Sequence, residues 1–243
     1  MALSRNRLVA ARFARAASNY EHHAGLQADV AAKLAELLPA LERPKVLEVG
    51  CGTGYLTRHL LERYPHGDFL ITDLAPEMVE RCSARHESRN GRSILFATMD
   101  GENPDCAGKF DLIALSMTVQ WFEDPLRGLR GLARLLKPGG CVLYAAPGRG
   151  CLPEWRAALE SHGLPHGGLE MPDLPHIVCE EDRTVDYGSG LAFLRTLKGI
   201  GATTPRPGYV PLRPGHLRAA LRRLERDHGA RVSWRIAYGK ISV

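Results

Sequence analysis

The sequence predicts a single α/β domain built around a mostly parallel sheet. Short, continuously apolar runs alternate with helix-like stretches between residues 45 and 147. Strands of this kind are apolar along their whole length because helices cover both faces of a parallel sheet. Three closely spaced glycines, Gly50, Gly52 and Gly54, directly follow the first apolar run. This position, after a strand and before a helix, is where open α/β sheets bind their ligands.

Each element of this core is predicted from the spacing of its apolar residues. Strands are expected where apolar residues run on without a break, and helices where they recur every three or four positions. Residues 5–38 are predicted to form helices, and Pro39 and Pro44 mark the exit from them. Helices are expected at residues 55–64, 76–88 and 124–137, the last one ended by Pro138-Gly139-Gly140. Strands are expected at residues 45–50, 68–74, 93–99, 110–117 and 141–147.

The character of the chain changes after Pro147. Glycine and proline become frequent, and a short helix is expected in "PEWRAAL". A strand is predicted at residues 183–187, helices at 190–202 and 216–229, and a final strand at 231–243. Without repeats or a low-complexity linker, one domain over residues 1–243 is the economical interpretation. Its expected parts are N-terminal lid helices (1–44), a ligand-binding core (45–147), cap insertions (148–230) and the final strand.

Composition limits the possible classes of function. The 243 residues include 44% hydrophobic and 24% charged residues, which excludes disordered and fibrous classes. No apolar run approaches a membrane span and no signal sequence is evident, so a cytoplasmic protein without a membrane partner is expected. The six cysteines are scattered without a Cys-x-x-Cys pair, which predicts reduced thiols and no metal site. The net charge of +5 suits an acidic partner, although a solvated basic surface explains it almost as well.

The glycine loop indicates the cofactor. A dinucleotide site requires Gly-x-Gly-x-x-Gly, whereas the third glycine here comes one residue early. Gly-x-Gly-x-Gly preceded by Glu48 resembles the class I S-adenosylmethionine-dependent methyltransferases, which implies a Rossmann-like, seven-stranded sheet whose last strand is antiparallel. Glu48 suits the cationic end of this cofactor, and the glycines admit its methionyl chain. Asp73, about twenty residues on and followed by Leu74, is placed to hold ribose hydroxyls. Asp100 and Gly101 are expected at the adenine, and Ser116, with Gln120 and Trp121, at the methyl-transfer cleft.

Three longer stretches indicate one family within this class of methyltransferases. They are "RFARAASNYEHHAGLQ", "GCVLYAAPGRGCLPEWRAAL" and "FLRTLKGIGATTPRPG", at residues 12–27, 140–159 and 193–208. Together they resemble the malonyl-acyl-carrier-protein O-methyltransferases of biotin synthesis over nearly the whole chain. That family esterifies the free carboxyl of a malonyl thioester, so that fatty-acid synthesis can elongate the masked chain toward pimelate. One departure is Ser116-Met117, where relatives often have Ser-Asn, so a polar contact is missing or replaced.

The chemistry implied by this resemblance needs no general base, because a malonyl carboxylate is already ionised at pH 7. Catalysis then depends on alignment and on the exclusion of water, which predicts a lid. Tyr20 is expected to close over the methyl group or touch the substrate, and Trp121 to line the cleft. A guanidinium or ammonium group is expected to orient the carboxylate. The candidates are Arg156, Lys198 and Arg206.

The expected partner is malonyl-acyl-carrier protein, which the resemblance implies is acidic, or malonyl-CoA. One predicted helix carries three arginines that could attract such a partner: Arg218, Arg222 and Arg223. An ordinary solvated helix face with mixed charges explains the same pattern. One alternative is an O-methyltransferase for a free small carboxylic acid, and another is a non-catalytic S-adenosylmethionine-binding protein. A nucleic-acid modifier is disfavoured because no RNA-binding motif or base-stacking platform is evident.

Overall fold

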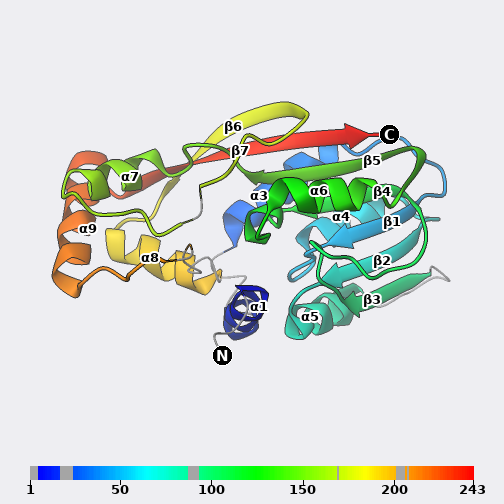
Figure 1. Ribbon diagram of the computed structural model, residues 1–243, viewed down its shortest axis with the longest axis horizontal. Coiled ribbons are helices and arrows are strands. Elements are labelled where there is room, and N and C mark those ends of the chain that lie inside the picture. The colour runs from blue at the N-terminus through cyan, green and yellow to red at the C-terminus, as the bar shows by residue number, and fades with distance from the viewer. Residues whose placement is uncertain (1–4, 17–23, 87–92, 169, 201–205, 207) are drawn as a thin grey trace.

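The computed structural model of the chain describes residues 5–16, 24–86, 93–168, 170–200, 206 and 208–243. Within them lies a seven-stranded sheet with the strand order β3-β2-β1-β4-β5-β7-β6, shown in Figure 1. The strands are β1 (Lys45–Val49), β2 (Asp68–Asp73), β3 (Ile94–Thr98), β4 (Phe110–Ser116), β5 (Leu136–Pro147), β6 (Ile177–Asp186) and β7 (Arg231–Ser242). Both the α/β class and the mostly parallel sheet expected from the sequence are confirmed.

The direction of the last strand also agrees with expectation. Strands β1 to β5 pair in parallel, whereas β7 is antiparallel to both β5 and β6. The strand order reverses between β1 and β4, because β2 and β3 extend the sheet on one side and β4 and β5 on the other. Such a switch point leaves a crevice at the carboxyl ends of the strands, and ligands bind there.

Helices cover both faces of the sheet. One core cluster joins Val46 of β1 to Leu34 of α3 (Gly25–Glu36), Leu60 of α4 (Tyr55–Arg63) and Cys82 of α5 (Pro76–His86). The other joins Leu47 of β1 to the helix α6 (Pro125–Ala133) on the opposite face. Successive residues of β1 therefore pack against different helical layers, which explains why the strand is apolar without alternation.

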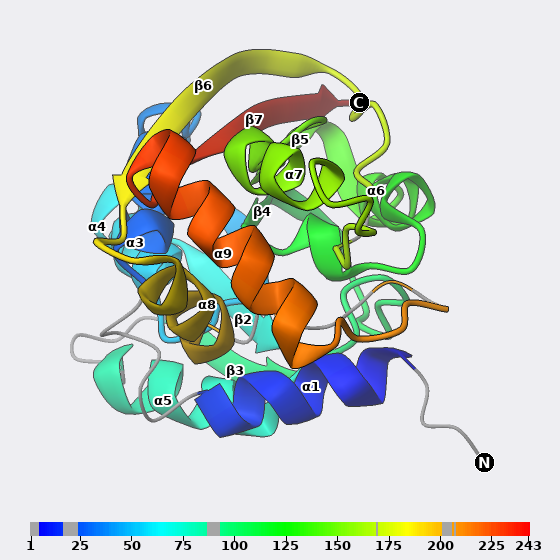
Figure 2. The same ribbon diagram turned by 90° about the vertical axis from the view of Figure 1, so that its left-hand side faces the viewer.

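The remaining helices form a cap beyond the ends of β1 to β4. They are α7 (Pro153–Glu160), α8 (Gly190–Gly199) and α9 (Pro214–His228), and they share a third apolar cluster around Trp155, Phe193 and Leu224. The N-terminal helix α1 (Arg5–Ala16) lies below α8 and beside α5 (Figures 1 and 2). None of the helices in the described ranges is long and apolar enough to cross a membrane.

The predicted bounds of three elements are wrong. The helix predicted at residues 124–137 ends at Ala133, and the strand predicted from residue 141 already begins at Leu136. The glycines that were expected to stop the helix instead pair with the chain end, since Gly139 N donates to Val243 O at 2.9 Å. The strand predicted at 183–187 is β6, which runs from Ile177 to Asp186. The charged residues in its first part do not indicate a strand. This edge strand is held in place by its pairing with β7 and not by the strand propensity of its residues.

Candidate active site

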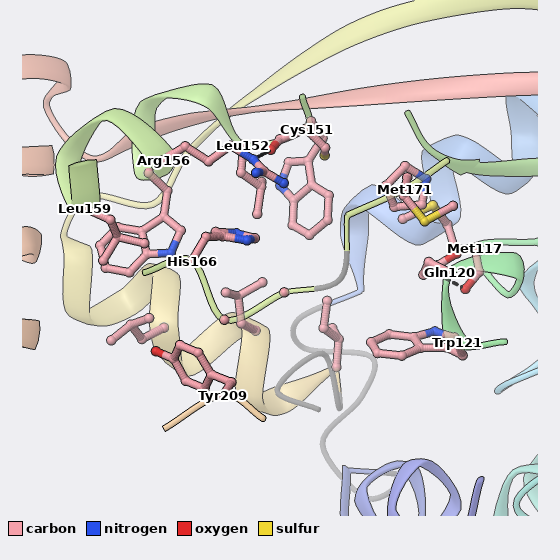
Figure 3. Close-up of a pocket in the computed structure, with 18 of the residues that line it drawn as sticks. Met117, Gln120, Trp121, Cys151, Leu152, Arg156, Leu159, His166, Met171 and Tyr209 are labelled. Atoms are coloured by element: carbon pink, nitrogen blue, oxygen red, sulfur yellow. Dashed lines mark hydrogen bonds between the residues drawn. The ribbon is translucent and has the colours of Figure 1, made fainter. Parts of the chain in front are cut away.

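Two cavities meet at the carboxyl end of the sheet. The smaller one, here called the strand-end cavity, has a volume of about 90 Å³ and is lined by residues that follow β1, β2, β3 and β4. The larger one, the cap cavity, has a volume of about 410 Å³ and lies between the end of β4 and helices α7, α8 and α9. Figure 3 shows residues of the cap cavity. The strand-end cavity is the place that the strand order predicts for a ligand.

The glycine loop forms one wall of the strand-end cavity. Gly50, Gly52 and Gly54 all have positive φ, in the left-handed region that side chains disfavour. A Cβ atom on Gly50 would lie 2.3 Å from Thr118 Oγ1, so the residue after β1 must be glycine for the end of β4 to approach it. Gly50 and Gly52 line the cavity, whereas Gly54 serves as the residue before the first turn of α4.

Asp73 at the end of β2 ties this loop to the neighbouring strand. Its Oδ2 accepts a hydrogen bond from Gly52 N at 2.9 Å, and its Oδ1 accepts one from Ala75 N at 2.9 Å. The side chain is buried, and burial raises the pKa of this carboxyl above its ordinary value, against the opposing effect of the backbone donors. The carboxylate thus lines the cavity with its orientation already set.

Glu48 is the second buried acid of this cavity. It is 1% exposed, and its Oε2 accepts a hydrogen bond from the hydroxyl of Thr57 at 2.7 Å. Burial raises the pKa of Glu48 to about 8, and repulsion from the nearby Asp73 adds to the shift. A cation that enters the cavity would lower the pKa of this carboxyl, because a nearby positive charge favours the ionised form.

The other residues predicted at the cofactor lie on the same cavity. Leu74, Asp100, Gly101 and Ser116 all line it, from the ends of β2, β3 and β4. Asp100 caps its own turn, accepting from Glu102 N at 3.0 Å and from Asn103 Nδ2 at 3.0 Å. A Cβ atom on Gly101 would lie 2.1 Å from Val49 Cγ1, so this turn can pack on β1 only with glycine there.

Four residues line both cavities and so mark their junction: Phe13, Gln27, Met117 and Trp121. Phe13 and Trp121 form an edge-to-face pair with ring centroids 5.2 Å apart. Met117 has φ of 52°, an unusual value for a residue with a side chain, directly after β4. This is the position where the sequence departs from its expected relatives, and here a methionine side chain contributes to the wall.

The predicted substrate residues are distributed unevenly around the cap cavity. Gln120 and Arg156 line it. The Arg156 guanidinium is already engaged, since Nε donates to Cys151 O at 2.8 Å and Nη1 lies 2.6 Å from Glu170 Oε1. Arg206 is exposed and holds the loop of His166 and Gly167 by hydrogen bonds to their carbonyls, and it is not part of the lining.

Lys198 is also outside the lining. It is exposed on α8, while Leu194, Leu197 and Ile200 of the same segment face the cavity. Tyr20 falls outside the described residues. No group of His, Cys, Asp and Glu in the described part of the chain could hold a metal ion.

The side chains of the site that the sequence did not predict include Phe13, Gln27 and His166. Gln27 had a signal, because it occupies the buried stripe of α3 with Val30, Ala31 and Leu34, where an apolar residue is expected. His166 lies in the irregular segment after α7, its Nδ1 is buried without a partner in the described structure, and burial lowers its pKa. No local pattern distinguishes a histidine in such a segment from a solvated one.

Known proteins are similar to this chain in sequence and in fold. A methyltransferase-domain family model matches residues 47–142. The chain is 38% identical to the malonyl-[acyl-carrier protein] O-methyltransferase of Magnetococcus marinus, over 97% of this chain and 92% of that protein. It is 41% identical to the biotin biosynthesis bifunctional protein BioCD of Bordetella avium over 97% of its length, but it spans only 52% of that protein. The YcgJ protein from Bacillus subtilis has the same fold, with a TM-score of 0.61 at 14% identity over 87% of this chain and 97% of that one.

Proposed function

Because the chain belongs to the malonyl-[acyl-carrier protein] O-methyltransferase family, we propose that it methylates the free carboxyl of a malonyl thioester with S-adenosylmethionine. Its fold is the Rossmann-like sheet of the class I methyltransferases. The observation that carries the proposal is the junction of the two cavities, because a group transfer needs two binding sites that meet at the reacting atoms. The reaction would mask a carboxylate early in biotin synthesis.

The strand-end cavity suits S-adenosylmethionine in shape and charge. The cofactor is a cation with an adenosyl group, and when bound it supplies an electrophilic methyl group. Glu48 offers a buried carboxyl to the cationic end, and Gly50 and Gly52 leave room beside the backbone. Asp73, beside Leu74, is assigned to the ribose. Asp100 and Gly101 are assigned to the adenine, and Ser116 to the floor between donor and acceptor.

Little acid–base chemistry is required of this chain. The malonyl carboxyl is ionised at pH 7 and can attack directly, so the protein has to align the two substrates and exclude water. Trp121 and Phe13 fit this task, since their rings form an apolar wall at the junction. Tyr20, in the segment between α1 and α3, is proposed to complete this wall, and residues 1–44 to act as the lid.

The cap cavity supports a thioester rather than a small free acid. Its volume of about 410 Å³ lies in the range of sites for drug-sized ligands, about 300–1,000 Å³, and exceeds what a three-carbon acid needs. Most of its lining is apolar, and Gln120, Arg156 and His166 supply polar groups. We assign the space to the acyl group and the arm that carries it. Arg156 would orient that arm, with Arg206 bracing the loop beside it and Lys198 acting only from the exposed rim.

The exposed face of α9 is the proposed docking site for an acidic carrier protein. Arg218 and Arg222 are exposed one helical turn apart and make no ion pair with any described residue. Arg223, by contrast, pairs with Asp227 on the same helix. Leu217 of α9 lines the cap cavity, so the basic face begins beside the cavity; Figure 2 shows α9 across the front of the molecule. The cytoplasmic location predicted from the sequence is part of the same proposal.

A methyl-transfer assay with labelled S-adenosylmethionine tests the proposal. The acceptors to compare are malonyl-carrier protein, malonyl-CoA, free malonate and acetyl-carrier protein. We expect base-labile methyl incorporation on the malonyl-carrier protein and none on the acetyl form, which lacks the free carboxyl. Transfer to free malonate alone would favour a free-acid methyltransferase. Tight cofactor binding without transfer to any acceptor would favour a non-catalytic binding protein.

A further inference from the structure

Gln27 is a buried polar side chain at the junction of the two cavities. It is 8% exposed and lies in the first turn of α3, on the face that packs against the sheet. Its amide oxygen Oε1 is buried and accepts no hydrogen bond from any described residue. Buried polar atoms in native proteins are nearly always paired, so an unpaired one facing a cavity indicates a ligand that supplies the partner.

The two cavities present different chemistry to this amide. On the strand-end side, the proposed methyl donor carries an α-ammonium group, which can only donate hydrogen bonds. On the cap side, the proposed acceptor presents a carboxylate, which can only accept them. A glutamine amide has one acceptor and two donors, so it can serve both ligands at once. None of the other three junction residues, Phe13, Met117 and Trp121, has both kinds of group.

The neutrality of the amide also matters for the reaction. The carboxylate loses its negative charge as the methyl group is transferred. A cation at that position would stabilise the ground state more than the transition state and would slow the step. Among the described residues that line both cavities none is charged, and Arg156 lies in the cap cavity only, engaged by Glu170. A neutral hydrogen-bond donor can orient the malonyl carboxylate without stabilising its charged ground state as strongly as a cation would.

We propose that Gln27 sets the relative position of the two substrates, its Oε1 accepting from the ammonium of the methyl donor and its Nε2 donating to the malonyl carboxylate. This inference rests on the proposed function. Gln120, the other glutamine of the cap cavity, cannot take this role because it lines only that cavity and its Nε2 donates to Met117 O at 2.7 Å.

Two substitutions test the bridge. Gln27→Met keeps the length of the side chain and removes both hydrogen bonds. We expect it to lower kcat/KM for the malonyl thioester roughly 10- to 100-fold, the size of a lost hydrogen bond to a charged group, and to weaken S-adenosylmethionine binding several-fold. Gln27→Glu replaces the Nε2 hydrogen-bond donor by a negative charge, provided that it is assayed above the pH at which the new carboxyl ionises in a titration of the variant; burial raises that pH and the cationic methyl donor lowers it. It should preserve or tighten binding of the cationic donor and still lower kcat/KM for the malonyl thioester at least about tenfold.

The opposite response of the two substrates to Gln27→Glu is the decisive result. If Gln27 has a merely structural role, Gln27→Glu should lower both the affinity for S-adenosylmethionine, measured by calorimetry, and kcat/KM for the malonyl thioester. That outcome would overturn the proposal. A Gln27→Met variant within twofold of the wild type in both measurements would overturn it as well. Wild-type enzyme that methylates no malonyl thioester would instead refute the proposed function itself. Thermal unfolding of each variant, with and without S-adenosylhomocysteine, separates these results from misfolding.

Discussion

Phe13 and Trp121 meet edge to face, with ring centroids 5.2 Å apart and an interplanar angle of 83°. The first belongs to the N-terminal helix α1 and the second to the turn Val119–Trp121 that follows β4. The contact thus joins the beginning of the chain to the core at the point where both cavities meet. Such a contact can form only in the folded chain, because the two residues are far apart in sequence.

Replacing Phe13 with alanine should open this wall. Edge-to-face pairs contribute about 0.5–1.5 kcal/mol beyond the buried area, so we expect roughly a tenfold loss of kcat/KM, with a smaller effect on overall stability. Methyl transfer to the malonyl thioester measures the loss. Leu8→Ala is the matched control on the same helix, because Leu8 is 40% exposed and lines neither cavity. Equal activity of both variants would contradict a role for the aromatic pair.

The buried acid Glu48 predicts a pH dependence of cofactor binding. Its pKa of about 8 in the free protein means that the carboxyl is protonated below that pH. A cationic ligand favours the ionised form, so binding below pH 8 must release the proton. The dissociation constant of S-adenosylmethionine should therefore fall as pH rises from about 6 to 8, by up to about tenfold per pH unit, and then level off. Calorimetry in buffers of different ionisation enthalpy measures both the affinity and the proton release.

The control for this prediction is Glu48→Gln, which keeps the shape of the side chain and removes its titration. This variant should bind the cofactor more weakly at pH 8 and show a flat profile over the same range. A wild-type profile that is equally flat would mean that the Glu48 carboxyl does not sense the cofactor's charge.

Gly50 is expected to tolerate no side chain. Gly50→Ala would place a Cβ atom 2.3 Å from Thr118 Oγ1 and would force an alanine to φ of 76°. The left-handed conformation alone costs a non-glycine residue about 1–2 kcal/mol, and the clash adds to this. We expect a lower melting temperature and at least about tenfold weaker cofactor binding, since the loop lines the cavity.

Gly25→Ala provides the contrast. A Cβ atom at Gly25 meets nothing within 4 Å, and the residue begins helix α3. Alanine there should be neutral or stabilising by up to about 1 kcal/mol, because it reduces the freedom of the unfolded chain. Differential scanning fluorimetry of the two variants compares the same substitution at a constrained and an open site.

Charge reversal on α9 should weaken carrier-protein docking specifically. The double variant Arg218→Glu, Arg222→Glu is expected to raise KM for malonyl-carrier protein roughly tenfold at low salt, and high salt should reduce the difference, because long-range attraction is screened. KM for malonyl-CoA should change much less. The double variant Arg130→Glu, Arg134→Glu, at two exposed arginines at the end of α6 that line neither cavity, controls for the same change in net charge. An equal effect on both thioesters would argue against docking at this face.

The core of the fold and the glycine loop could be predicted because their signals are local. Continuous apolar runs, the glycines after β1 and the acid at the end of β2 are adjacent features of one short stretch, and the strand order brings the carboxyl ends of those strands together. Edge strand β6 was underestimated for the opposite reason. Its charged residues resemble a loop, and only pairing with β7 over its whole length makes it a strand.

What the sequence by itself determined is therefore the sheet, the strand-end cavity and the family of the chain. Only the tertiary structure decided which side chains share the junction, because Phe13, Gln27 and Trp121 come from segments that become neighbours through packing. The tertiary structure also decided that Lys198 is exposed. The residues of this segment that line the cavity are Leu194, Leu197 and Ile200. Lys198 lies about 100° around the helix from Leu197, the middle one of these three. Direction on a helix can be computed from spacing, but the side that meets a cavity depends on what packs against that helix.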